Sequence, residues 1–170
     1  MKKQIKVLTI GGATQDIFLH YKDLDTVSLP KNGEDKKYVL LEEGAKVDLK
    51  ELNYYSGGGA TNSAVAFKRL GLDVSAVFKL GRDCQADFVV SDLKKESIDI
   101  SHVIYSDTLP TAISVIFPCP SGDRVVLAYR GANKDLDIHD LDLNIIKNYN
   151  SLYITSLSDR SANIFFELTR

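Results

Sequence analysis

Residues 56–71 read Ser-Gly-Gly-Gly-Ala-Thr-Asn-Ser-Ala-Val-Ala-Phe-Lys-Arg-Leu-Gly. Three glycines precede a segment whose apolar residues recur at helical spacing, and Gly71 is a natural C-terminal stop. The pattern predicts a helix over residues 60–70 that begins directly after a glycine turn. Glycines let a backbone approach a ligand closely, and a helix N-terminus offers unpaired N–H groups with a partial positive charge. The stretch therefore indicates either a ligand-binding helix start or simply a tight strand-to-helix turn.

Two polar residues near this turn suggest which ligand it would take. Residues 4–10 predict a buried first strand that Gly11 and Gly12 end, and Asp16 follows at the edge where open α/β sheets bind ligands. Asn62 lies in the first turn of the predicted helix. A carboxylate, an amide and bare backbone N–H groups together suit a polyhydroxylated ligand. The alternatives are a turn-forming role for Asp16 and an N-terminal capping role for Asn62.

The rest of the chain alternates strand and helix patterns. Asp83 is a candidate cap for a second helix, and a third helical pattern starts near Ser161. Further strands are predicted over residues 38–41, 51–55, 74–78, 101–105, 111–117, 124–130 and 151–155. The first two of these flank the most polar stretch of the chain, which favours a small sheet outside the core. The alternation predicts an α/β fold with a mostly parallel sheet.

Composition excludes several classes of protein. The chain has 170 residues, 44% of them apolar, and its 21 Lys+Arg against 23 Asp+Glu give a net charge of −2. A chain of this length is expected to form one hydrophobic core. Its net charge lacks the basic excess that a nucleic-acid binder needs. No run approaches the length of a membrane span, and Gly11-Gly12 interrupt any signal-peptide pattern. Two cysteines, Cys84 and Cys119, cannot build a disulfide framework, so we expect a cytoplasmic protein.

Other motifs that carry chemistry are absent from the sequence. A dinucleotide fingerprint would need a third glycine where Asn62 stands and an acidic residue after the next strand, which disfavours an oxidoreductase domain. A P-loop would need a Gly-Lys pair, and the chain has none. The three histidines have no metal-ligand spacing, and the acids of residues 135–142 lack the central Gly and closing Glu of a calcium loop. We therefore expect no metal site.

The order of the motifs resembles one known family. Residues 57–64, with Gly71 and Gly81, match the first sequence signature of the PfkB, or ribokinase-like, sugar kinases. Further motifs of that family follow in the same order: Ile10-Gly11-Gly12 with Asp16, Gly81-Arg82-Asp83, Ser97 to Ile100, Thr111-Ala112, and Arg130 to Asn133. Many ribokinase-type members carry Lys where this chain has Gly59, and Gly where it has Ala86, so the resemblance does not fix the sugar.

The resemblance implies a fold and its division. It predicts a ribokinase-like αβα sandwich with a Rossmann-like, mostly parallel sheet and a small β-sheet lid. Residues 1–16, 57–101 and 122–170 would form the core, and residues 17–56 and 102–121 the lid. In this family the lid often serves for dimerisation as well, which implies a homodimer.

The resemblance also implies an activity: transfer of the γ-phosphoryl group of ATP, with Mg²⁺, to a hydroxyl of a sugar or nucleoside. By match to the motifs, the substrate-binding residues would be Asp16, Gly58, Gly59, Asn62, Thr111 and Ala112.

One part of the family pattern is missing from residues 1–170. The second signature, D-T-x-G-A-G-D, supplies the family's catalytic base and anion hole, and this chain does not contain it. The last helical pattern also runs to Arg170 without a cap, after only about three strands of the core sheet. We therefore expect the N-terminal portion of a longer kinase, without catalytic residues, without the ATP and Mg²⁺ site, and inactive alone. The alternative is a short, non-catalytic sugar-binding or interaction module of the same fold.

Overall fold

The structure, a computed structural model, describes residues 5–22 and 24–168. The strands are β1 (Lys6–Ile10), β2 (Thr14–Tyr21), β3 (Thr26–Lys31), β4 (Glu34–Val39), β5 (Leu49–Gly57), β6 (Asp73–Val77), β7 (Lys79–Leu80), β8 (Ile104–Tyr105), β9 (Ala112–Pro118), β10 (Arg124–Tyr129) and β11 (Ser151–Ile154). The α-helices are α1 (Gly59–Arg69), α2 (Cys84–Lys95), α3 (Leu143–Ile146) and α4 (Asn163–Leu168), and the 3₁₀ helices are η1 (Gly131–Asp135), η2 (Ile138–Asp140) and η3 (Asp159–Ala162). Gln4 and Arg170, the expected ends of the first strand and the last helix, lie outside the described residues. Within these residues, no helix is long and apolar enough to cross a membrane.

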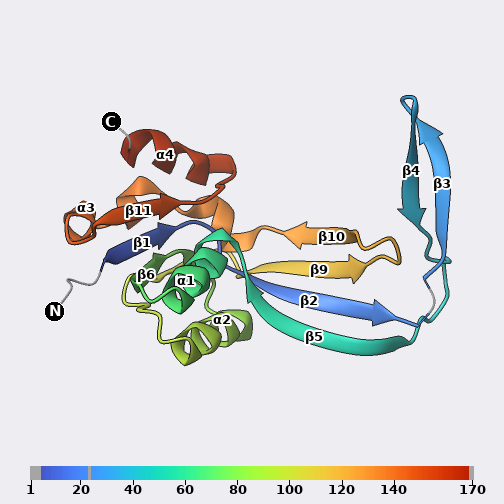
Figure 1. Cartoon of the computed structure of the whole chain (residues 1–170), viewed down its shortest axis with the longest axis horizontal. Coiled ribbons are helices and arrows are strands. Elements are labelled where there is room, and N and C mark those ends of the chain that lie inside the picture. Colours follow the sequence, from blue (N-terminus) through green and yellow to red (C-terminus); the bar gives the residue numbers. More distant parts are fainter. Residues whose placement is uncertain (1–4, 23, 169–170) are drawn as a thin grey trace.

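The core is a parallel sheet between two layers of helices. Its strands follow the order β11-β1-β6, and the short pair β7–β8 is also parallel. In Figure 1, α1 and α2 lie on one side of these strands and α3 and α4 on the other. Because both faces are covered, β1 is buried from Val7 to Ile10 instead of alternating. Its polar member, Thr9, donates its hydroxyl hydrogen to the Ala60 carbonyl at 3.0 Å.

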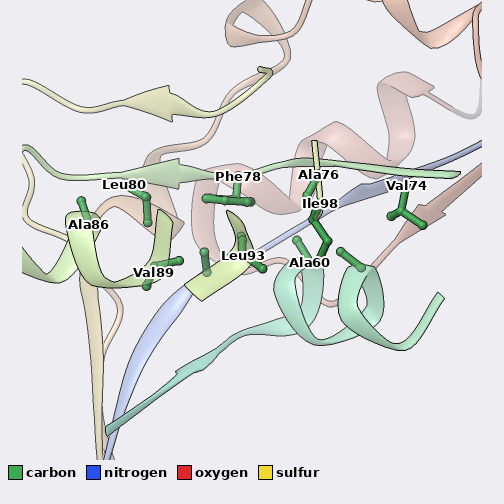
Figure 2. Close-up of a cluster of buried hydrophobic side chains, with 11 residues drawn as sticks. Ala60, Val74, Ala76, Phe78, Leu80, Ala86, Val89, Leu93 and Ile98 are labelled. Carbon is green, nitrogen blue, oxygen red and sulfur yellow. The ribbon is translucent and has the colours of Figure 1, made fainter. Parts of the chain in front are cut away.

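Two apolar clusters hold these layers together. The cluster in Figure 2 lies between the sheet and α1 and α2, and the small side chains of Ala60 and Ala64 let α1 approach Phe78 and its neighbours closely. The second cluster lies on the opposite face, where Val77 meets Ile164 of α4. Val77 and Phe78 are adjacent in the chain but belong to different clusters, as the alternation of side chains along a strand requires.

A second sheet extends away from the core, with no helix over most of its length (Figure 1). It has the order β10-β9-β2-β5, in which β2 and β9 are parallel and the outer pairs antiparallel. We call it the lid sheet. The hairpin β3–β4 stands at its far end as a separate two-stranded sheet (Figure 1).

The two faces of the lid sheet differ in chemistry. Side chains that are opposite each other in the ladders share a face. One face, which we call the apolar face, carries Ile17, Leu19, Leu52, Tyr54, Ile113, Val115, Phe117, Val125, Leu127 and Tyr129, with the polar Gln15 and Ser56 at its base. The other, which we call the mixed face, carries Asp16, Phe18, Asn53, Tyr55, Ser114, Ile116, Val126 and Ala128. Helix α2 reaches only the base of the apolar face, where Phe88 lies 6.4 Å from Tyr54 between ring centres.

Strand pairing places two segments differently from the sequence-based boundaries. The range 122–170 was expected in the core, but β10 pairs with β9 and belongs to the lid sheet. The range 102–121 was expected in the lid, but β8 pairs with β7 beside the core. The reason is local in the first case: Pro118 to Asp123 form a turn, and a turn that short returns the chain as an antiparallel neighbour. The strand expected at 38–41 corresponds to β4, which begins earlier, ends at Val39 and pairs with β3 in a hairpin.

Candidate functional site

The site begins where β5 runs into α1. Gly58 has φ +102°, a conformation open to glycine, and a side chain there would overlap the Gly12 carbonyl oxygen. A side chain on Gly59 would overlap Thr155, at the end of β11. The amide of Ala60 donates to that same Gly12 carbonyl at 3.0 Å. The glycines are therefore required because three chain segments converge on the first turn of α1.

Asp16 lies beside this turn on the mixed face of the lid sheet. It is opposite Tyr55 on β5 and Ser114 on β9, and Gly57 has no side chain where the Asp16 carboxylate lies. Burial raises the pKa of this carboxyl, and a hydrogen bond from Ser114 offsets the rise only in part. A half-buried carboxylate with one protein donor keeps lone pairs for further donors. A substrate contact of Asp16 stays a prediction.

Asn62 lies in the first turn of α1, and its backbone N–H donates to the Gly58 carbonyl oxygen at 3.0 Å. Its exposed side chain borders a hollow of about 210 Å³ that Tyr55, Ser56 and Asp92 also line. Ser56 donates a short hydrogen bond to Asp92, which ties the end of β5 to α2. In the described part of the chain no hydrogen bond joins Asn62 to Asp16. Asp16 does not line this hollow, so the hollow does not join the two residues predicted to bind the substrate.

The two lid residues predicted to face the substrate are placed differently from each other. Thr111 is fully buried, and its hydroxyl donates to Asp83 at 2.6 Å and accepts from the Gly81 amide at 2.9 Å. Its hydrogen bonds are therefore used to join the start of β9 to the cap of α2. Ala112 is opposite Thr14 on β2, on the mixed face. A substrate contact of either residue stays a prediction.

Asp83 and Asn133 have larger roles than their motifs indicated. Asp83 caps α2 by accepting from the Ala86 amide at 2.9 Å, and it also holds both the amide and the hydroxyl of Thr111. Asn133 accepts from the Ala13 amide at 2.9 Å, at the turn between β1 and β2. Both residues were visible in the sequence as parts of motifs. Their contacts could not be predicted from the sequence, because the partners lie 28 and 120 positions away in the chain.

Potential metal ligands do not form a group in the described part of the chain. Among residues 5–22 and 24–168, no three His, Cys, Asp or Glu side chains group closely enough to hold a metal ion.

A comparison with models of protein families identifies the family of this chain. Residues 31–170 match the model of the pfkB family of carbohydrate kinases. The chain belongs to this family. Among curated relatives of this pfkB-family chain, the ribokinase of Staphylococcus aureus (strain COL) is 26% identical over 136 residues, which are 80% of this chain and 40% of that protein. The 5-dehydro-2-deoxygluconokinase of Clostridium perfringens is 34% identical over 114 residues, 64% of this chain and 33% of that protein.

Solved structures give the fold of this pfkB-family chain. It superposes on the ribokinase of Giardia lamblia with a TM-score of 0.78 at 18% identity, over 96% of this chain and 49% of that one. The Arabidopsis thaliana ribokinase, determined in complex with ribose and ATP, gives a TM-score of 0.66 at 20% identity, over 89% of this chain and 45% of that one. The chain therefore has the ribokinase-like α/β fold and spans less than half the length of the relatives it matches.

Proposed function

We propose that this chain is the sugar-binding portion of an ATP-dependent kinase that phosphorylates a hydroxyl of a sugar or nucleoside. One observation carries the proposal: the Asp16 carboxylate lies against Gly57, immediately before the bare-glycine start of α1. A hydrogen-bond acceptor then lies beside a helix N-terminus. Family membership supports the same reading.

The proposed role of each substrate-binding residue follows from the chemistry of its polar groups. Asp16 accepts hydrogen bonds from substrate hydroxyls, and Asn62 can both accept and donate. Gly58 and Gly59 lead into the first turn of α1, where the helix dipole favours negative charge. The Ala60 amide in this turn is already bonded to the Gly12 carbonyl. Substrate hydroxyls would also replace part of the solvation that the half-buried Asp16 carboxylate has lost.

Phosphoryl transfer depends mostly on positioning and on electrostatic stabilisation of the transferred group. By resemblance, the family's catalytic base and anion hole belong to its second signature, which residues 1–170 do not contain. ATP is proposed as the phosphoryl donor, and its site and that of Mg²⁺ are proposed outside these residues. We place no step of the transfer on a residue of this chain, and we propose that the chain alone binds its substrate without turnover.

Calorimetric titration of the 170-residue chain with pentoses, hexoses, sugar acids and nucleosides tests the binding half of the proposal. We expect one class to bind with 1:1 stoichiometry, and the Asp16→Ala variant to lose most of that affinity. A coupled assay for ADP release, run with the same compounds, should give no turnover. Binding that is unchanged in both Asp16→Ala and Asn62→Ala would contradict the proposed site, and steady ADP release would contradict its inactivity.

A non-catalytic sugar-binding module is the second candidate. It requires only the residues proposed for substrate binding, all of which this chain contains. Reading the downstream coding sequence, and expressing it together with this chain, distinguishes the two candidate functions. A Gly-Ala-Gly-Asp helix start with ATP turnover supports the kinase, and sugar binding without any turnover supports the module.

We also propose that two copies associate through the apolar face of the lid sheet. Five of its side chains, namely Leu52, Tyr54, Val125, Leu127 and Tyr129, are exposed to solvent. None of the residues that the strand ladders pair on the apolar face is charged, and contiguous apolar patches of this kind mark interaction surfaces. A self-complementary face suits a two-fold dimer, and it leaves the mixed face with Asp16 to the substrate. Free Cys84 and Cys119 fit the cytoplasmic location that we propose for the dimer.

A further inference from the structure

The turn at the start of η1 packs against the base of β9. Gly131 has φ +46°, and a side chain there would overlap the Pro110 carbonyl oxygen. The neighbouring Ala132 is fully buried, and its amide donates to that same Pro110 carbonyl at 2.8 Å. The turn therefore holds the chain two residues before β9 begins.

The next residue of the turn holds the base of β2. The Asn133 side chain accepts from the Ala13 amide at 2.9 Å through Oδ1, and its Nδ2 donates to the Thr14 hydroxyl at 3.3 Å. Gly12 makes room for it, since a Cβ there would lie 3.1 Å from Asn133 Nδ2. One short turn thus contacts the bases of both strands.

These two strands need an anchor of this kind. β2 and β9 are parallel neighbours, with Thr14 opposite Ala112 and Asp16 opposite Ser114. Antiparallel neighbours can be aligned by a tight hairpin, but residues 22–111 lie between β2 and β9, so no turn between them sets their register. A slip by one position would move Asp16 away from Ser114 and onto the other face of the sheet.

The turn at the start of η1 is itself fixed to the core. The buried ammonium of Lys79 on β7 donates to the Asp135 carbonyl at 3.0 Å and to the Asp140 carboxylate at 2.8 Å. The Ser161 hydroxyl donates to the carbonyl of Asn133 at 2.7 Å. Contacts from the sheet and from η3 therefore keep the backbone of Asn133 in place while its side chain reaches β2.

We propose that Asn133 is a positioning residue for the substrate site: by clamping the β1–β2 turn beside the base of β9, it holds the Asp16 carboxylate at Ser114 and the start of α1. The inference rests on the proposed function only in taking Asp16 as the ligand of the sugar.

Three variants of the 170-residue chain test the proposal. Asn133→Ala removes both contacts to β2. Asn133→Asp restores them, because a carboxylate accepts from the Ala13 amide and from the Thr14 hydroxyl, which can rotate to donate. Asn144→Ala is the matched control, the same substitution at an exposed asparagine of α3.

Two readouts separate positioning from general stability. The first is the pH titration of the Asp16 carboxyl carbon by NMR, which needs no ligand. The second is the affinity for D-ribose by calorimetry, well below the unfolding temperature. In Asn133→Ala we expect the Asp16 pKa to move toward its ordinary value and ribose affinity to fall about tenfold, as for the loss of one to two hydrogen bonds. Asn133→Asp should restore both, and Asn144→Ala should change neither.

The outcomes are distinct. An unchanged Asp16 titration in folded Asn133→Ala, or an equal change in Asn144→Ala, would overturn the positioning role. If the parent chain binds no ribose, the titration alone decides: a change specific to Asn133 supports the clamp even though the substrate proposal has failed for that sugar. If Asn133→Ala does not fold, Thr14→Val removes one of the two contacts, and a smaller shift of the Asp16 titration in the same direction is required.

Discussion

Gly58 shows how a single residue combines a backbone requirement with a spatial one. Its φ of +102° strains any other residue, and its missing side chain leaves room for the Gly12 carbonyl. Gly122 also has a positive φ, +83°, but nothing lies within 4 Å of the position that its Cβ would take. We expect Gly122→Ala to lower the free energy of unfolding by about 1 kcal/mol, from strain alone. Gly58→Ala should cost about 3 kcal/mol or more. Equal losses in urea denaturation would contradict the close approach.

The Asp16 carboxylate is expected to lower the free energy of unfolding while it raises the affinity for the sugar. Burial raises the pKa of its carboxyl above the ordinary 3.8, so between these two values the folded state binds more protons than the unfolded state. The free energy of unfolding then falls as the pH rises through this window and stays lower at neutral pH. Asp16→Asn removes this loss, so we expect a higher melting temperature at pH 7 and a flatter pH profile from pH 4 upward.

The same Asp16→Asn variant should bind sugar more weakly, by about 1–3 kcal/mol for the weakened hydrogen bonds. Asp48→Asn, at an exposed position before β5, is the matched control for the change in net charge. A variant that is neither more stable nor weaker in binding would show that the Asp16 carboxyl is not held as described.

At the scale of elements, Asp83 joins helix α2 to strand β9. Burial acts to raise the pKa of its carboxyl, but hydrogen bonds from the hydroxyl and amide of Thr111 and from the Ala86 amide lower it overall, below 3.8. A depressed pKa means that this carboxylate contributes stability above pH 3.8, which is lost as the pH falls through the folded-state value. Asp83→Ala removes a helix cap and two further bonds to a charged acceptor, so we expect a loss of about 2–4 kcal/mol at pH 7.

Chemical denaturation at pH 7 and at pH 3 measures this contribution. Asp83→Asn should narrow the difference between the two pH values, because an amide cannot replace the ionised acceptor. Asp87→Asn changes an exposed acid in the first turn of the same helix and is the control. If both variants respond alike, the effect belongs to the helix dipole and not to the bonds with Thr111.

Local patterns predicted most of these elements. The glycine turn, α1 with its stop at Gly71, and the cap at Asp83 follow from rules that act over a few residues, and the structure confirms each of them. The role of the Thr111 side chain could not be predicted, because its partners Gly81 and Asp83 lie about 30 positions away. The neighbour of β10 is different, because the short turn before it returns the chain beside β9 and is visible in the sequence.

At the scale of the whole molecule, the two faces of the lid sheet depend on a register that the sequence does not contain. The alternation within β2 or β10 alone does not tell which of its two faces joins Asp16. The parallel pairing of β2 with β9 decides it, by placing Leu127 with Ile17 and Val126 with Phe18. The substrate side and the proposed dimer side therefore emerge only when all four strands are aligned.

This alignment yields a sharp test of the dimer. Leu127 and Val126 are neighbours on the edge strand β10, 58% and 43% exposed, and they point to opposite faces of the lid sheet. A lysine at either position has a similar cost in strand propensity. If two copies associate through the apolar face, Leu127→Lys buries a charge in the interface and should give a monomer. Val126→Lys points to the mixed face and should leave the dimer intact. Sedimentation velocity over a range of protein concentrations measures both, and a dimer that survives Leu127→Lys, or dissociates equally in Val126→Lys, would exclude the apolar face as the interface.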